Sequence, residues 1–162
     1  MKPTLTNLTV SLEAIETLLF YSERLDAILD AMLAQCTGPW PGGLAEALKQ
    51  LSTAQKLSVL KDLLARIFSV LPDHLGSIKP VLKAASDACT VAEDIICTYV
   101  TQTKGLSSFE MSNAVIAMME VAVKLQRVAN NLAFDMMMAN VQRNISAEET
   151  KEVDQKKGVY DA

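Results

Sequence analysis

The sequence predicts an all-α protein, an antiparallel four-helix bundle of long helices with a short charged C-terminal tail. Apolar residues recur every three or four residues through long segments of the 162-residue chain. Stretches rich in Gly, Pro or Ser, at residues 37–43, 71–77 and 104–108, divide those segments. Ala and Leu together outnumber the β-branched residues, and no alternating, strand-like pattern occurs in the sequence. Long helices joined by short connections commonly pack as antiparallel bundles.

The first two predicted helices differ in charge. The first spans residues 10–35 and carries five acidic residues against one arginine. The second lies within residues 44–71 and is basic overall, and Ser52 with Gln55 forms a capping-box pattern that can interrupt it. Opposite charges favour packing of these two helices against each other, although each exposed pair contributes only about 0–1 kcal/mol.

The third and fourth helices follow from the remaining apolar segments. The third spans residues 77–104 and tolerates Pro80 because proline fits the first turn of a helix. The fourth starts at a second capping box, Ser107 with Glu110, and runs to about Arg143.

A division into two parts is predicted near the C-terminus. Residues 1–145 form a single helical-bundle domain, and residues 146–162 form a charged, partly disordered tail. A third capping-box pattern, Ser146 with Glu149, opens this tail and predicts a new, frayed helix there.

Charge and composition exclude several classes of protein. The net charge is -4, and no basic cluster is larger than Lys156 and Lys157, so we expect no nucleic-acid partner. No run of about 18 uncharged apolar residues predicts a transmembrane segment, and the N-terminus lacks the apolar core of a signal peptide. Three cysteines cannot form a disulfide framework, which favours a reducing, cytoplasmic compartment; signal-independent export stays open.

The sequence offers little for catalysis, and we expect no enzyme, no catalytic residue, no metal site and no cofactor. The only histidine is His74, in a predicted loop, and no family-type context surrounds Cys36, Cys89 or Cys97. Zinc sites with several cysteines need Cys-x-x-Cys-like spacing, and di-iron bundles need more than one histidine.

The fourth helix carries two apolar rows. An inner row with alternating four- and three-residue spacing predicts the bundle contact; it comprises Met111, Val115, Met118, Ala122, Leu125, Ala129, Leu132, Met136 and Ala139. A second row, here called the outer row, comprises Ile116, Met119, Val123, Phe134, Met137 and Val141, with Asn130 in line with them. Six of the eight methionines lie on this helix, and methionine suits both irregular cores and adaptable partner surfaces. The outer row is therefore either additional core or a partner-binding surface.

Trp40 is the other candidate partner-binding residue. It is flanked by Pro39 and Pro41, which restrict the backbone and hold the indole in a fixed direction. Trp40 either closes one end of the bundle or serves as an exposed anchor, because tryptophan is enriched at interface hot spots.

These observations favour a non-enzymatic helical interaction protein: an adaptor, a chaperone-like protein or a structural accessory subunit. We expect it to bind a protein partner or to form a homo-oligomer through the fourth helix. The alternative is a bundle that encloses an apolar ligand or lipid. The stretch 110–126 (EMSNAVIAMMEVAVKLQ) resembles the C-terminal helix of flagellar and type III secretion rod proteins, which adds a secretion-apparatus component as a further alternative.

Overall fold

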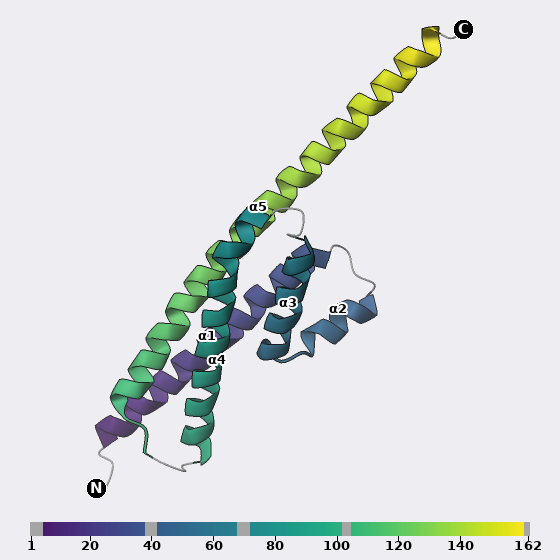
Figure 1. Ribbon diagram of the computed structural model, residues 1–162. Coiled ribbons are helices and arrows are strands. Elements are labelled where there is room, and N and C mark those ends of the chain that lie inside the picture. Colours follow the sequence, from purple (N-terminus) through teal and green to yellow (C-terminus); the bar gives the residue numbers. More distant parts are fainter. Residues whose placement is uncertain (1–4, 38–41, 68–71, 102–104, 161–162) are drawn as a thin grey trace. The chain divides into compact units, whose positions relative to one another are not determined.

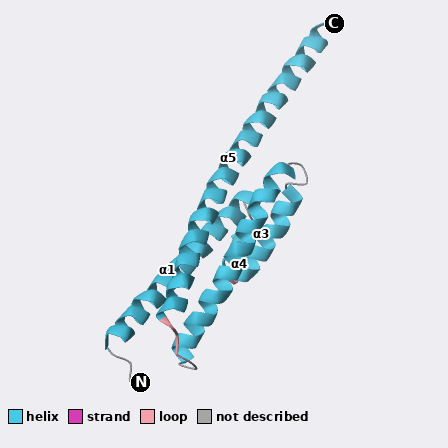
Figure 2. Ribbon diagram, turned by 60° about the vertical axis from the view of Figure 1, so that its left-hand side comes forward, coloured by secondary structure: helices cyan, strands magenta, loops and turns pink. Residues whose placement is uncertain are grey.

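The computed structural model describes residues 5–37, 42–67, 72–101 and 105–160, and these ranges contain helices and no strand. In chain order the helices are α1 (Leu5–Thr37), α2 (Gly42–Lys49), α3 (Thr53–Ile67), α4 (Pro72–Thr101) and α5 (Ser108–Tyr160) (Figures 1 and 2). The predicted all-α fold is confirmed, with several long helices packed against one another.

The chain forms two compact units, Met1–Ala129 and Asn130–Ala162. In the first unit α1 packs against α2, α3 and α4, and α3 packs against α4. The second unit contains the remainder of α5. The division at residue 145 into a bundle domain and a tail stays a prediction.

Capping explains why the predicted second helix is two helices. The backbone N–H of Ser52 donates to Gln55 Oε1 (2.9 Å), and the N–H of Gln55 donates to Ser52 Oγ (3.3 Å). This reciprocal pair supplies acceptors to two donors that the first turn of a helix leaves unpaired. The interruption expected near Ser52 is therefore confirmed, with α2 before it and α3 after it.

Three helix boundaries predicted from the sequence are wrong. α1 begins five residues before the predicted residue 10, at Leu5. α4 begins at Pro72, which suits a first helical position because its missing N–H would be unpaired there, and so Pro80 lies inside the helix. α5 continues through Ser146 and Glu149, because inside a continuous helix the backbone N–H groups already bond the preceding turn and need no cap.

The core of the first unit is apolar except at two of the described positions, Lys56 and Thr98. Its largest fully buried apolar side chains are contributed by α1, α3 and α5, and they are Leu18, Leu25, Leu29, Met32, Leu33, Leu60, Leu64, Met118 and Leu125. α4 contributes smaller ones, including Ala85 and Ala92. Each large side chain stabilises the fold by roughly 1.5–3 kcal/mol relative to an exposed one. Of the two polar residues, Lys56 carries a charge, and its side chain is 0% exposed.

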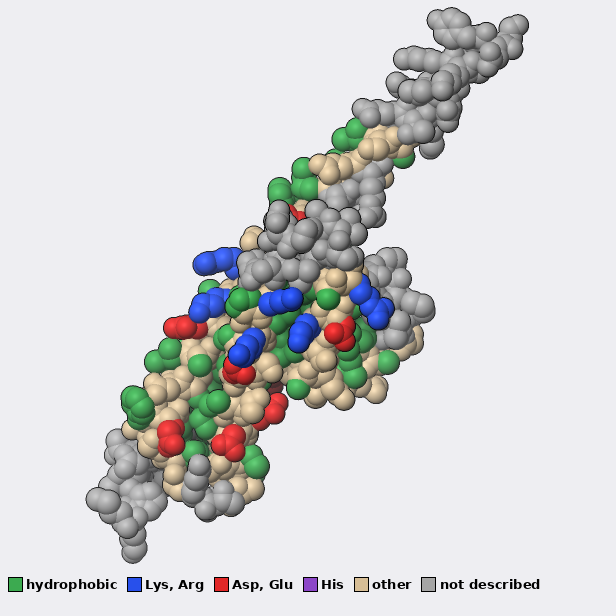
Figure 3. All heavy atoms as spheres, viewed as in Figure 1, with side chains coloured by type: hydrophobic (Ala, Val, Ile, Leu, Met, Phe, Trp, Pro, Cys, Tyr) green, Lys and Arg blue, Asp and Glu red, His purple; other side chains and the backbone are tan. Residues whose placement is uncertain are grey.

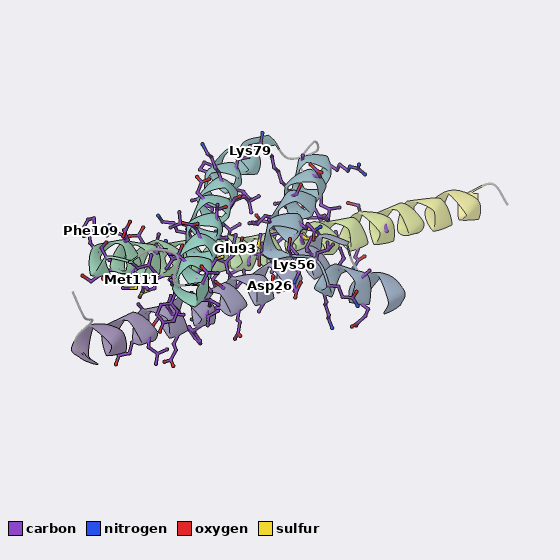
Figure 4. All side chains as sticks on the ribbon, turned by 90° about the horizontal axis from the view of Figure 1, so that it is seen from below. Asp26, Lys56, Lys79, Glu93, Phe109 and Met111 are labelled. Carbon is purple, nitrogen blue, oxygen red and sulfur yellow. The ribbon has the colours of Figure 1, made fainter. Side chains whose placement is uncertain are left out.

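Two carboxylates of α1 hold the buried ammonium group of Lys56. Its Nζ lies 2.6 Å from Asp26 Oδ2 and 2.8 Å from Asp30 Oδ1, and Thr53 Oγ1 donates to Asp26 Oδ1 (3.2 Å). Figure 4 shows Lys56 on α3 beside Asp26 on α1. Desolvation lowers the pKa of Lys56, but hydrogen bonds and charge attraction from Asp26 and Asp30 raise it more, so its pKa lies above the ordinary value. The predicted electrostatic pairing of the acidic first helix with the basic second segment is confirmed.

Replacing Lys56 tests how much this contact stabilises the fold. Removing one partner of a buried pair costs about 3–5 kcal/mol, and we expect about 1–3 kcal/mol for Lys56→Met because Asp26 and Asp30 are each about one-third exposed. Lys124→Met is the matched control, since Lys124 pairs with Glu120 at 3.5 Å with both side chains exposed; it should cost at most about 0.5 kcal/mol. Urea unfolding of both variants measures the difference, and equal losses would contradict a structural role for Lys56.

The pH dependence of this stabilisation follows from the direction of the pKa shift. Because the pKa of Lys56 in the folded chain lies above the ordinary value of 10.5, its contribution is fully present below pH 10.5 and is lost as pH rises through the folded-state value. The difference in unfolding free energy between the wild type and Lys56→Met should therefore stay constant from neutral pH to about pH 9.5 and shrink above pH 10.5. Urea titrations at several alkaline pH values measure it. A difference that grows with pH would show that the pKa of Lys56 is lowered, not raised, in the folded chain.

Candidate interaction surface on helix α5

The start of α5 is fixed by the predicted capping box. The backbone N–H of Ser107 donates to Glu110 Oε2 (3.0 Å), and the N–H of Glu110 donates to Ser107 Oγ (3.1 Å). The Ser107 hydroxyl also donates to the same carboxylate oxygen (2.7 Å). This cap sets the first residue of α5, and the helical repeat then determines which residues share each face.

The inner row of α5 is buried, as the sequence predicts. The buried members are Met111, Met118, Ala122, Leu125, Ala129 and Leu132. Val115 and Met136 are half-buried, and the side chain of Ala139 lies outside the described residues. One apolar face of α5 thus forms part of the protein interior.

The outer row is exposed in both units. Exposure ranges from 42% at Met119 to 59% at Phe134; the other members are Ile116, Val123, Met137 and Val141, and the aligned Asn130 is exposed as well. Met118 and Met119 are adjacent in the sequence, yet the first is fully buried and the second is not. Among the residues that the structure describes, the inner row is therefore mostly buried and the outer row is exposed.

Two exposed residues extend this surface beyond the predicted set. Met138 is 41% exposed and Ile145 is 52% exposed. In chain order, Phe134, Met138, Val141 and Ile145 are spaced by four, three and four residues. This spacing is typical of coiled coils and could have been recognised in the sequence. The other predicted partner-binding residue, Trp40, lies outside the described residues.

Burial makes the thiols of Cys36 and Cys89 weaker acids. Burial raises the pKa of Cys36 to about 11. Burial, followed by the negative charges of Glu93 and Asp26, raises the pKa of Cys89 to about 11. Both thiols are therefore protonated at neutral pH, whereas a nucleophilic cysteine needs a lowered pKa. The side chain of His74 lies outside the described residues, and within the described part no three His, Cys, Asp or Glu residues gather as a metal site.

Two grooves flank α4, and neither was predicted from the sequence. The groove between α3 and α4 has a volume of about 440 Å³ and is basic, because Lys61, Lys79 and Lys83 line it. The groove between α4 and the first part of α5 has a volume of about 630 Å³ and an apolar floor. Figure 3 shows that Lys and Arg side chains gather near one end of the first unit, while Asp and Glu border apolar side chains nearer the other end.

Comparison with protein-family models, curated proteins and solved structures finds no match for the chain. Among the described residues, no helix has the length and apolar character needed to cross a membrane.

The assignment of the inner row can be tested at Leu125, which is fully buried. Leu125→Asp should destabilise the fold by about 3–5 kcal/mol, since it removes a core side chain and buries an unpaired carboxylate. Arg127→Asp puts the same carboxylate on an exposed position two residues along α5 and should change stability by less than about 1 kcal/mol. Urea unfolding followed by circular dichroism measures both variants. If Leu125→Asp costs no more than Arg127→Asp, the inner row does not face the core.

Proposed function

We propose that this chain is a non-enzymatic helical interaction protein, an adaptor, chaperone-like protein or structural accessory subunit, that self-associates through the outer row of α5. The observation that carries the proposal is the exposure of all six apolar side chains of that row, from 42% to 59%. Single exposed apolar residues are common on proteins, whereas an aligned set marks an interaction site.

The size of this surface suits a stable pairing of helices. Together with Met138 and Ile145 the outer row supplies eight large apolar side chains, each 41–59% exposed. Five of these side chains lie in the second unit, and a set of exposed apolar side chains of this number is typical of an interaction surface.

A second copy of the chain is the occupant that the periodicity favours. Apolar residues spaced by three and four match the same spacing on another helix, and a two-fold axis brings one row against its own copy. Residues 130–160 of the second unit are helical, and the apolar side chains Phe134, Met138, Val141 and Ile145 are exposed there. Helices in proteins gain most of their stability from packing of an apolar face, so pairing stabilises this segment.

Three methionines make the surface tolerant of imperfect pairing. Met119, Met137 and Met138 are all exposed. Unbranched methionine side chains adapt their shape to the groove that they meet.

We also propose a cytoplasmic location, because Cys36, Cys89 and Cys97 are all free thiols, as expected in a reducing compartment.

Charged substitutions in the outer row test self-association. In the double variant Met119→Lys with Met137→Lys, two ammonium groups enter the apolar interface, and the dimer dissociation constant should rise at least about tenfold, which is 1.4 kcal/mol. Helicity should be retained, because both side chains are exposed in the single chain and a long lysine stem reaches water. Light scattering measures the mass, and circular dichroism measures the helicity.

The matched control places the same charges on other helices. Ser58→Lys with Thr90→Lys changes two exposed polar positions on α3 and α4 and should leave the mass unchanged. The proposal is wrong if the wild type is a monomer at every concentration, or if the methionine variant keeps the wild-type mass. Native mass spectrometry separates the alternative function, since an enclosed apolar ligand adds a small mass to the 17.6 kDa chain rather than multiplying it.

A further inference from the structure

We propose that the groove between α4 and α5, here called the acidic groove, binds a basic amphipathic helix from a partner protein. The acidic groove has a volume of about 630 Å³, and its lining residues all lie in the first unit. No residue of the outer row lines it. This binding surface is therefore separate from the self-association proposed above and does not depend on it.

The floor of the acidic groove is apolar and shallow. Four alanines line it, Ala84 and Ala88 on α4 and Ala114 and Ala117 on α5. Small side chains let a neighbouring helix approach closely, because the distance between packed helices is set by the side chains at the contact. Val91 also lines the floor and is 50% exposed, so apolar area is available for a partner.

The length of the acidic groove fits a helix better than a small ligand. Its lining residues extend from position 84 to 95 on α4 and from 110 to 124 on α5. At 1.5 Å per residue these segments are roughly 17 Å and 21 Å long. About four turns of an added helix cover that length and place apolar residues at positions i, i+3, i+4 and i+7 on the floor.

The rim determines the charge of the partner. Asp87, Asp94, Glu110 and Glu120 line the acidic groove with Lys124 as the one cation, which gives a net charge of -3 from four acids and one lysine. Lys124 is already paired with Glu120 at 3.5 Å. Neither Asp87 nor Asp94 makes an ion pair with a described residue.

An apolar helix flanked by Lys or Arg complements this rim, whereas an acidic helix is repelled. The charge of the groove also distinguishes it from its neighbour across α4. The groove between α3 and α4 is basic, although Asp87 lines both. A basic helix is therefore attracted to the side of α4 that faces the acidic groove. Asp94 lines this groove and does not line the basic one.

The probe for the acidic groove is a synthetic 16-residue peptide helix of about four turns with Leu and Ala on one face and Lys on the other. Its control carries Glu at every Lys position. With a fluorescent label on each peptide, we expect anisotropy to show binding of the Lys peptide, weaker binding as salt is added, and no binding of the Glu peptide.

Matched variants of the chain locate the binding. Asp94→Lys should weaken binding of the Lys peptide at least about tenfold, because it replaces attraction with repulsion at the rim. Glu93→Lys makes the same charge change at the adjacent exposed residue, which does not line the groove, and should change the affinity less than about threefold. Ala117→Phe keeps the charge but fills the floor, and it should also weaken binding while circular dichroism confirms retained helicity.

Three results would overturn the proposal: binding of the Glu peptide as tight as that of the Lys peptide, equal effects of Asp94→Lys and Glu93→Lys, or loss of binding only in the Met119→Lys, Met137→Lys variant. The last result would place the peptide on the outer row. Failure of self-association in the wild type has no bearing on these peptide measurements, so the two proposals fail separately.

Discussion

The buried ammonium group of Lys56 is the constraint on which the packing of the first unit depends. A charge in a protein interior is tolerated only beside opposite charges, and Lys56 has Asp26 and Asp30 within 2.8 Å. These two carboxylates are four residues apart on α1, so they fix where α3 lies along α1 and which face it presents. Apolar contacts such as those of Leu60 and Leu64 contribute stability, but the hydrophobic effect is non-directional, whereas the ion pairs join specific atoms.

A second constraint acts on α5, where one helix carries two apolar rows. Within the first unit, Met118 and Leu125 of the inner row are fully buried. The outer row points elsewhere on the same helix, because residues one position apart are separated by about 100° around the axis. Met119 and Val123 are exposed for this reason. The exposed row is a consequence of a sequence pattern that places apolar residues on two faces of one helix.

The features that the sequence predicted well are local ones. The capping boxes at Ser52 and Ser107 form because their partners Gln55 and Glu110 are only three residues away. The inner row of α5 was predictable because a helical repeat converts spacing directly into a face. The pattern at Ser146 failed, since a capping box marks a helix start only where the preceding backbone is not already helical.

The features that the sequence did not predict depend on contacts between segments. Lys56 shares a helix face with Leu60 and Leu64, at intervals of four residues, and this spacing is consistent with a buried position. Its two partners, Asp26 and Asp30, lie on α1, so the spacing within α3 does not identify them. The acidic groove needs alanines of α4 and α5 to face each other, and no spacing within one helix reveals that. The exposure of the outer row likewise required knowing that no other described helix of the chain covers it.

Self-association through α5 is tested most directly by hydrogen–deuterium exchange of the wild-type chain over about a hundredfold range of protein concentration. Pairing of the outer row protects the backbone of residues 130–147 and leaves α3 (Thr53–Ile67) unaffected. We expect the amides of 130–147 to exchange more slowly as the concentration rises, with constant exchange in α3. Exchange in 130–147 that does not depend on concentration would contradict self-association through this helix.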